Sequence, residues 1–128
     1  DIADTEEQQK EETEESFKIQ KIPTKKNDKI ILFNPPEIDY IESVNSAVVV
    51  HVGGESYNCG MTLTELETKL VHYGFFRCHR SYIVNLQKVR EIITWTKNSY
   101  SLRLNVGKES VVPLSRTKLV ELKQLLNI

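Results

Sequence analysis

The sequence of this 128-residue chain predicts a mainly β domain with two short helices. Short runs rich in β-branched and aromatic residues recur from Lys29 onward, and Gly, Pro or Asn residues separate them. The pair Gly53-Gly54 supplies the positive φ angles that a two-residue hairpin needs. Only two segments carry apolar residues at helical spacing. A chain of this length has room for one core, and therefore for one domain.

The first 20 residues are expected to lie outside that domain, as an acidic linker or disordered tail. Residues 1–16 hold eight of the 18 Asp and Glu residues but one of the 17 Lys and Arg residues. Apart from Ile2, Phe17 and Ile19, the first 20 residues offer almost nothing to bury, so burial cannot offset the entropy lost on ordering. A solvated helix is the alternative, because Glu, Gln and Lys are good helix formers. The domain itself would span residues 21–128.

The first half of the domain reads as an antiparallel meander. Residues 29–33 and 38–43 are expected to be strands, and Asn34-Pro35-Pro36 forbids a regular strand or helix through the join. Residues 47–52, AVVVHV, are almost all β-branched and turn through Gly53-Gly54 into a strand over 55–59. The positions of these turns therefore predict that consecutive strands pair as an antiparallel meander.

A short amphipathic helix is expected next. Thr62 and Glu65 are spaced as a capping box, in which each side chain satisfies a free backbone N–H group of the other residue. Gly74 supplies a stop. The apolar residues on one face of this helix are Leu63, Leu66, Leu70 and Tyr73.

The end of the chain is expected to form a second hairpin, a strand and a final helix. The hairpin would pair residues 88–95 with 99–106 and turn at Lys97-Asn98. A strand over 110–112 would end at Pro113, which cannot donate to a sheet. Ser115 is a good N-cap for the last helix, whose expected apolar face is Leu119, Leu122, Leu125 and Leu126.

Residues 74–89, GFFRCHRSYIVNLQKV, break the period of two that an ordinary strand shows. The polar run from Arg77 to Ser81 lies between apolar anchors, which predicts a presented loop fixed at both ends. Lys88 and Arg90 follow it and extend a basic cluster. The four residues from Ser115 to Lys118 form a second basic cluster at a helix N-terminus, where free backbone N–H groups favour phosphate.

The charge of the chain is segregated. Its formal net charge is −1, but after residue 16 there remain 16 basic and ten acidic residues. A basic domain with two basic presented sites suggests a polyanion such as nucleic acid. The alternative is that these Lys and Arg residues only solvate the surface.

No catalytic or metal-binding motif emerges. His51 lies in a β-branched strand and His72 in the last turn of a helix, so both are interpreted as structural. Cys78 and His79 are adjacent, and neighbours on an extended chain point to opposite faces, which argues against a nucleophile and base pair. Two cysteines outside any CxxC spacing indicate free thiols. Glycine motifs for nucleotide phosphates are absent. We expect neither an enzyme nor a bound cofactor or metal.

The protein is expected to be cytoplasmic. No apolar run approaches the roughly 20 residues of a membrane helix, and no charged-then-apolar secretory signal opens the chain. The chain begins at Asp1 and its one methionine is Met61, which suggests a segment of a longer protein.

In their order and spacing, these motifs resemble the LytTR-type DNA-binding domain, the output module of many bacterial two-component response regulators. The resemblance spans about residues 21–128 and rests on four segments: IDYIES at 38–43, TLTELE at 62–67, GFFRCHRSYIVNLQKVREI at 74–92 and VPLSRTKLVELKQLL at 112–126. It implies an elongated stack of small antiparallel sheets, a β-β-β sandwich with two short helices, that reads DNA with loops.

The resemblance also implies that three loops approach one face of double-stranded DNA. The base contacts would come from Asn45, His79, Arg80 and Arg116. The backbone contacts would come from Ser46, Arg77, Ser81, Ser115, Thr117 and Lys118. Arg116 is the strongest candidate for a base contact, because a guanidinium can bond O6 and N7 of guanine together.

Partners follow from the same resemblance. The domain would be a monomer that pairs on direct repeats in a promoter, downstream of a receiver, a membrane segment or a transporter ATPase. Some family members pair a cysteine at the Cys78 position with one near the final strand. Residues 110–112 hold none here, so a redox switch would need Cys59. The rival interpretation is a protein-interaction or ligand-binding β module whose basic loops bind an acidic partner.

Overall fold

The computed structural model describes residues 20–106 and 110–128. The predicted tail over residues 1–20 lies outside this part except for Gln20. The strands are β1 (Ile22–Lys26), β2 (Lys29–Phe33), β3 (Tyr40–Val44), β4 (Ala47–Val52), β5 (Glu55–Cys59), β6 (Phe75–His79), β7 (Tyr82–Asn85), β8 (Val89–Thr96), β9 (Ser99–Leu104) and β10 (Ser110–Leu114). The helices are α2 (Leu63–Leu70) and α3 (Arg116–Leu126), with short 3-10 turns η1 (Pro35–Glu37), η2 (Val71–Tyr73) and η3 (Leu86–Lys88).

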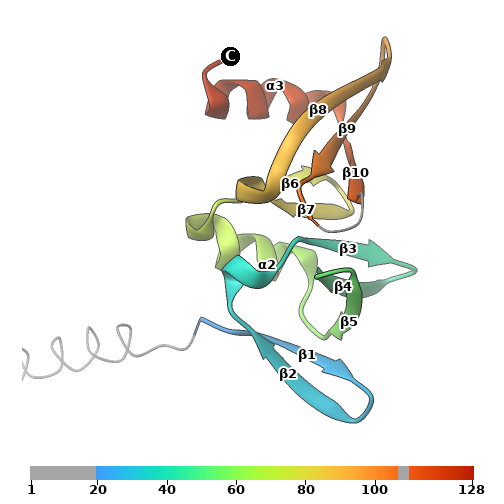
Figure 1. Cartoon of the computed structure of the whole chain (residues 1–128), viewed down its shortest axis with the longest axis vertical. Helices are drawn as coiled ribbons and strands as arrows, with labels where there is room; N and C mark the ends of the chain where they lie inside the picture. Colours follow the sequence, from blue (N-terminus) through green and yellow to red (C-terminus); the bar gives the residue numbers. More distant parts are fainter. Residues whose placement is uncertain (1–19, 107–109) are drawn as a thin grey trace, which may run out of the picture.

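The strands form two antiparallel sheets stacked along the long axis of the molecule (Figure 1). The larger sheet has the strand order β2-β1-β5-β4-β3-β7-β6, and the smaller has the order β10-β9-β8. The β1–β2 hairpin lies at one end, and α3 with the smaller sheet lies at the other. The predicted mainly β stack with two short helices is confirmed.

The β6–β7 hairpin separates two hydrophobic cores. Phe75 and Ile83 belong to the lower core with α2 and strands β1, β3, β4 and β5. Phe76 and Val84 belong to the upper core with β9, β10 and α3. Successive residues of a strand point to opposite faces, so a hairpin buried on both faces must carry adjacent apolar residues.

This burial corrects the prediction of a presented loop from residue 77 to 81. Residues 77–79 belong to strand β6, and Cys78 is fully buried in the upper core. Only Arg80-Ser81 forms the turn. A cysteine counts as polar in a period-two pattern but packs as a small apolar side chain.

Strand β1 is not among the strands that the sequence predicts. Its burial alternates, with Ile22 and Thr24 buried, but Pro23 and two lysines hide that alternation. The strand pairs along its whole length with β2 through a turn at Asn27-Asp28, where both residues have positive φ. Pairing with β2 and β5, rather than local propensity, therefore holds it in the sheet.

The prediction that Pro113 ends a strand is also wrong. Strand β10 continues to Leu114, and Pro113 stands opposite Ser101 of β9. Because β10 is an edge strand of the smaller sheet, a missing N–H group can be tolerated there.

Helix α2 begins as predicted, but it ends at Leu70, before the predicted stop at Gly74. The Thr62 hydroxyl accepts from the Glu65 N–H at 3.1 Å, and the Glu65 carboxylate accepts from the Thr62 N–H at 3.2 Å. Val71 to Tyr73 continue as η2, and Gly74 ends the segment with a φ of 78°.

Helix α3 differs in two respects from its prediction. Leu122 is fully buried and Leu119 packs on the upper core, but Leu125 and Leu126 remain 62% and 48% exposed. The C-terminal end of α3 extends past the sheet that its first half covers (Figure 1). Ser115 occupies the N-cap position, but its side chain makes no capping hydrogen bond.

A small buried polar cluster joins the middle of the chain to the start of β3. The Asn85 amide donates to the Ile38 carbonyl at 3.0 Å and accepts from the Gln87 N–H at 3.1 Å. Lys88 donates to the buried Asp39 carboxylate at 2.6 Å. Lys88 is therefore engaged inside the fold, in contrast to its predicted place in the basic cluster.

Candidate nucleic-acid interface

The turn between β3 and β4 presents Asn45 and Ser46. Both residues are exposed and have positive φ angles, 49° and 67°, which fit a tight hairpin turn. At the base of this hairpin, the Ser43 N–H donates to the Ser81 carbonyl at 2.9 Å. The first loop is thereby fixed to the turn between β6 and β7.

The turn between β6 and β7 holds His79 in one tautomer. The Ser81 N–H donates to Nδ1 of His79 at 3.1 Å, so a neutral ring carries its proton on Nε2. The ring also meets Tyr82 edge-on, with 5.6 Å between centroids. Burial, and secondarily the Arg80 charge, lowers the pKa of His79. The neutral imidazole can therefore donate one hydrogen bond outward.

Arg77 binds groups of its own chain. Its Nη2 donates to the Arg80 carbonyl at 2.7 Å, and its Nη1 donates to Glu67 at 3.2 Å and to Thr64 at 3.3 Å. The guanidinium thus clamps the turn to α2. By contrast, the side chain of Arg80 is exposed, and within residues 20–106 and 110–128 no protein group bonds it.

The start of α3 is joined to the same hairpin. The Ser115 N–H donates to the Cys78 carbonyl at 2.9 Å. Arg116 and Thr117 are exposed at the first turn. Lys118 instead bonds Glu121 at 3.1 Å, and its ammonium lies 5.7 Å from the centre of the Phe76 ring. In the described part of the chain, the Arg116 guanidinium lacks a protein partner.

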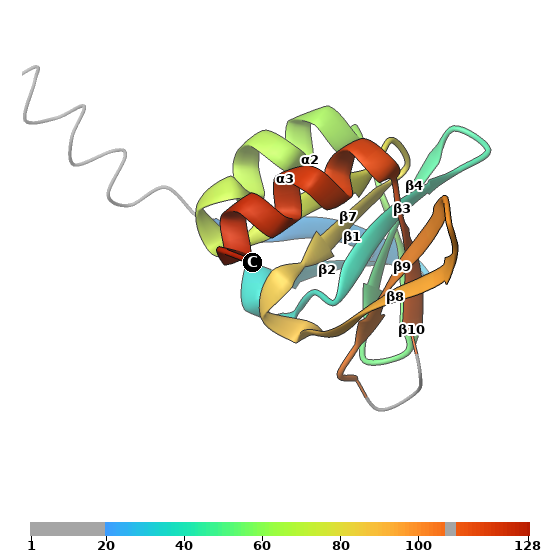
Figure 2. The same cartoon turned by 90° about the horizontal axis from the view of Figure 1, so that it is seen from above.

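These three sites lie on one side of the molecule. Figures 1 and 2 both show the β3–β4 turn, the β6–β7 turn and the N-terminal end of α3 on the right-hand side. The backbone bonds from Ser43 to Ser81 and from Ser115 to Cys78 link them in sequence. The Ser115 side chain does not cap the first N–H groups of α3, and such groups can donate to an anion. The three sites together form a row, which suits an extended anionic ligand.

Several residues that support these loops have no functional signal in the sequence. Thr64 and Glu67 lie in the predicted helix, yet they hold the Arg77 guanidinium. Ser43 lies in a predicted strand, yet it fixes the second turn. No sequence pattern marks such contacts, because they join elements that the fold brings together.

The cysteines lie in different cores. Cys59 belongs to the lower core and donates to the Pro23 carbonyl at 3.4 Å, whereas Cys78 belongs to the upper core. Both are free thiols. Burial raises the pKa of Cys78 to about 12 and raises that of Cys59 as well. The structure therefore gives no disulfide between them.

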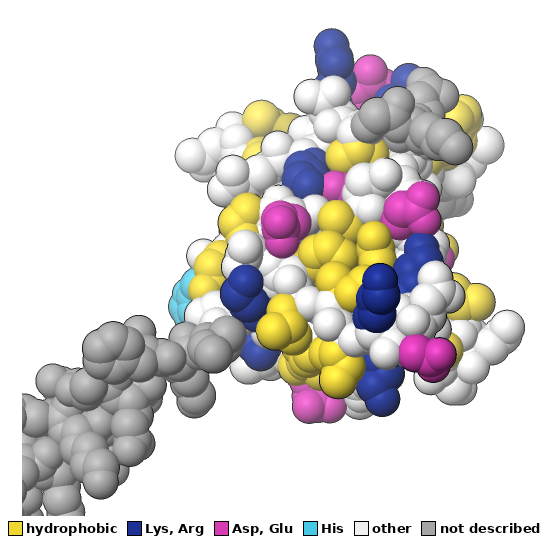
Figure 3. Space-filling model, turned by 60° about the horizontal axis from the view of Figure 1, so that its bottom comes forward, with side chains coloured by type: hydrophobic (Ala, Val, Ile, Leu, Met, Phe, Trp, Pro, Cys, Tyr) yellow, Lys and Arg dark blue, Asp and Glu magenta, His cyan; other side chains and the backbone are white. Residues whose placement is uncertain are grey.

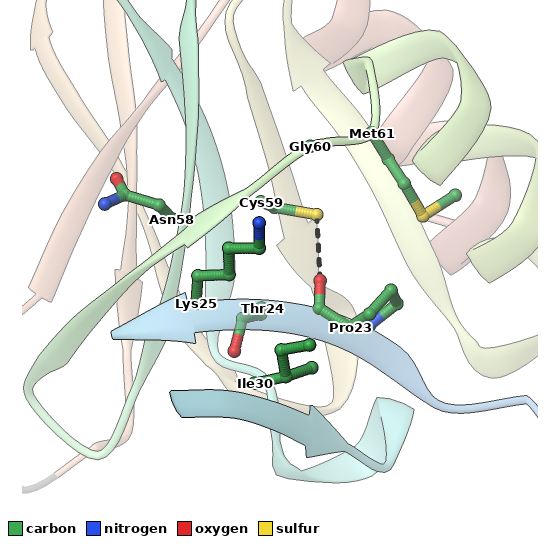
Figure 4. A pocket seen from close by; sticks show the side chains of 8 residues that line it. All are labelled: Pro23, Thr24, Lys25, Ile30, Asn58, Cys59, Gly60 and Met61. Carbon is green, nitrogen blue, oxygen red and sulfur yellow. Dashed lines mark hydrogen bonds between the residues drawn. The ribbon is translucent and has the colours of Figure 1, made fainter. Parts of the chain in front are cut away.

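A shallow apolar hollow of about 520 Å³ lies at the other end of the molecule, between β1 and β5 (Figure 4). Ile30, Cys59 and Met61 contribute to its lining. The underside of the molecule shows apolar side chains interspersed with basic and acidic ones (Figure 3). This hollow is separate from the three loops.

Two further features of the described residues bear on function. None of the helices there is both long enough and apolar enough to cross a membrane. Across the same residues, no three His, Cys, Asp or Glu side chains gather closely enough to hold a metal ion.

Comparison with known proteins gives a consistent result. The family model of the LytTr DNA-binding domain matches residues 28–127. The transcriptional regulatory protein YpdB of Escherichia coli K12 is 42% identical over 103 residues, which cover 80% of this chain and 42% of YpdB. The sensory transduction protein LytT of Bacillus cereus is 37% identical over 116 residues, covering 91% of this chain and 46% of LytT. The chain thus spans less than half the length of these relatives.

A solved structure has the same fold. A LytTr DNA-binding domain from Bacillus cereus superposes with a TM-score of 0.77 at 24% identity, over 87% of this chain and all of that one.

Proposed function

The chain belongs to the family of LytTr DNA-binding domains, and on this premise we propose that it binds double-stranded DNA sequence-specifically through its three linked loops. It would act in the bacterial cytoplasm as the output domain of a transcription regulator, part of a two-component system. A DNA-binding regulatory domain is not an enzyme class, so no reaction is assigned. The observation that carries the proposal is the row of three loops joined by main-chain hydrogen bonds.

Bases would be read by exposed donors at the loop tips. Arg80 and Arg116 are free of protein partners among the described residues, and each guanidinium can bond O6 and N7 of one guanine. His79 would donate from Nε2, since its Nδ1 is occupied by Ser81. Asn45 has both a donor and an acceptor, as adenine recognition requires.

Backbone contacts would position the domain on the duplex. Ser115 and Thr117 lie at the uncapped start of α3, where phosphate oxygens can accept from helix N–H groups. Ser46 and Ser81 would contribute from the two turns. Arg77 and Lys118 would act mainly by supporting these loops, because their charged groups already bind within the chain.

Titration with salt tests this function. A duplex would first be selected by the chain from a library with a randomised centre, and its affinity compared with that of a scrambled duplex. The logarithm of the binding constant should fall with the logarithm of salt concentration, with a slope of about −0.9 for each phosphate contacted. The preference for the selected duplex should persist. Equal affinity for both duplexes at every salt concentration would exclude sequence-specific reading.

Pairing on DNA is a separate part of the proposal. Two copies would bind direct repeats, with a regulatory domain elsewhere in the longer protein controlling the pairing. Analytical ultracentrifugation with a one-repeat and a two-repeat duplex measures this. Two copies should bind the longer duplex more tightly than two independent sites predict.

The rival interpretation, in which the basic loops bind an acidic protein, gives a different result. An acidic peptide would then compete with DNA, and no duplex would be enriched by selection.

A further inference from the structure

The hairpin of β8 and β9 is a fourth projection on the side that carries the three loops. Its turn lies at Lys97-Asn98, between the ends of the two strands. In Figure 1 its tip lies beyond the N-terminal end of α3, continuing the row along the long axis of the molecule. The view from above places it on the same side as the β3–β4 turn (Figure 2). A duplex lying along the row would pass this tip.

The tip is built of polar, exposed residues without negative charge. Every residue from 94 to 99 is exposed, and the segment TWTKNS contains neither Asp nor Glu. Lys97 and Asn98 offer an ammonium and an amide, and no protein side chain of the described residues binds either one. These are donors suited to phosphate oxygens.

The tip is also held in a fixed shape. The Tyr100 hydroxyl donates to the Lys97 carbonyl at 2.8 Å across the turn. Below it, the indole N–H of Trp95 donates to the Ser101 hydroxyl at 3.0 Å. A preorganised tip loses little freedom when a ligand binds.

Apart from its indole hydrogen bond, Trp95 lies at the surface of the domain. Its side chain is 57% exposed and belongs to neither core. Its one polar group is already satisfied by Ser101, so the open face of the ring is what it presents. Large exposed aromatic rings are enriched where proteins bind partners.

We propose that the β8–β9 tip is a fourth contact with duplex DNA, on the sugar-phosphate backbone that flanks the site reached by α3. Lys97 and Asn98 bond phosphate oxygens there, and the ring of Trp95 packs against the adjacent sugars. This inference rests on the proposed function, since it requires that the three loops bind the duplex.

Fluorescence of Trp95 tests the contact directly, because it is the only tryptophan in the chain. The selected duplex is used at full length and after removal of about half a helical turn, roughly five base pairs, from either end. Anisotropy of a dye on the DNA reports binding, and acrylamide quenching reports the exposure of Trp95. The full duplex should protect Trp95 from acrylamide. Removing the flank on the α3 side should abolish that protection while the shortened duplex still binds, and removing the opposite flank should preserve it.

The variant Lys97→Ala with Asn98→Ala supplies a second measurement. It should lower the salt slope on the full duplex by about 0.9 for each phosphate that the tip no longer neutralises, and should leave binding to the shortened duplex unchanged. Lys123→Ala, an exposed lysine at the far end of α3, is the matched control and should keep the full slope. Binding that leaves Trp95 as quenchable as in the free protein would overturn the fourth contact alone. Failure to bind any duplex would instead overturn the proposed function.

Discussion

The backbone N–H of Ser115 lies 2.9 Å from the carbonyl oxygen of Cys78 and donates to it. This bond joins the residue before α3 to the middle of β6, so the third loop is fixed to the strand that leads into the second. A main-chain bond does not depend on either side chain. The spacing between Arg80 and Arg116 is therefore set by the backbone, and replacing either side chain should leave that spacing unchanged.

Arg116→Ala and Lys118→Ala should affect DNA binding differently. Loss of the Arg116 fork should relax discrimination at one or two base pairs by about 1–3 kcal/mol. Loss of Lys118 should weaken binding to all sequences similarly. Its ammonium is held by Glu121 beside the Phe76 ring, so it would support the third loop and would not read a base. Competition binding with single-base-pair variants of the selected duplex measures both. A uniform loss in both variants would contradict a base contact by Arg116.

Arg77→Met should destabilise the fold. The Arg77 guanidinium bonds the Arg80 carbonyl, Glu67 and Thr64, so its removal should lower the free energy of unfolding by about 1–2 kcal/mol after allowance for solvent screening. Urea unfolding measures this. Arg90→Met, at an exposed position in β8, is the matched control and should change stability little. Unchanged stability in Arg77→Met together with weakened DNA binding would instead indicate a direct phosphate contact.

The stability of the domain should fall as acid protonates His79. Its pKa in the folded state is lowered by burial and by Arg80, so the unfolded chain takes up the proton first as the pH falls below about 6.5. The free energy of unfolding should therefore decrease from that pH down to the folded-state pKa and be independent of His79 below it. Urea titrations at several pH values, compared with His79→Gln, isolate this effect. A wild-type profile parallel to that of the variant would contradict it.

Cys78 should resist thiol reagents in the native state. With a pKa of about 12, its thiolate fraction at pH 8 is about one in ten thousand, and the sulfur is buried. In the Cys59→Ser variant, labelling by a thiol-specific dye should therefore proceed only as fast as the domain opens. Added urea should accelerate it in step with unfolding. Rapid labelling in the absence of urea would revive the hypothesis of a redox role.

Local signals predicted most of the fold. The capping box of Thr62 and Glu65, the glycine turn at Gly53-Gly54 and the break at Pro35 each act through their own backbone, so each is visible in the sequence. The places where prediction failed depend on distant partners. Strand β1 needs β2 and β5 beside it, and Pro113 is tolerated because its strand lies at an edge.

The sequence indicates which residues could form the candidate interface, but only the fold shows which of their charged groups are held within the chain. Arg77 and Arg80 look alike in the sequence, and only the positions of Glu67 and Thr64 separate the held guanidinium from the free one. Arg116 and Lys118 differ in the same way, through Glu121 and Phe76. The sequence predicts only a turn at Lys97-Asn98, because the position of this tip beyond the N-terminal end of α3 depends on the fold.

The β6–β7 hairpin, which both cores share, also affects how the domain unfolds. Phe75 and Ile83 face one core while Phe76 and Val84 face the other. Unfolding of either core alone would expose the apolar side chains on one face of this hairpin to water. Because either half would expose the shared hairpin if it unfolded alone, we expect the two cores to unfold as one cooperative unit and the geometry of the loops to persist until then.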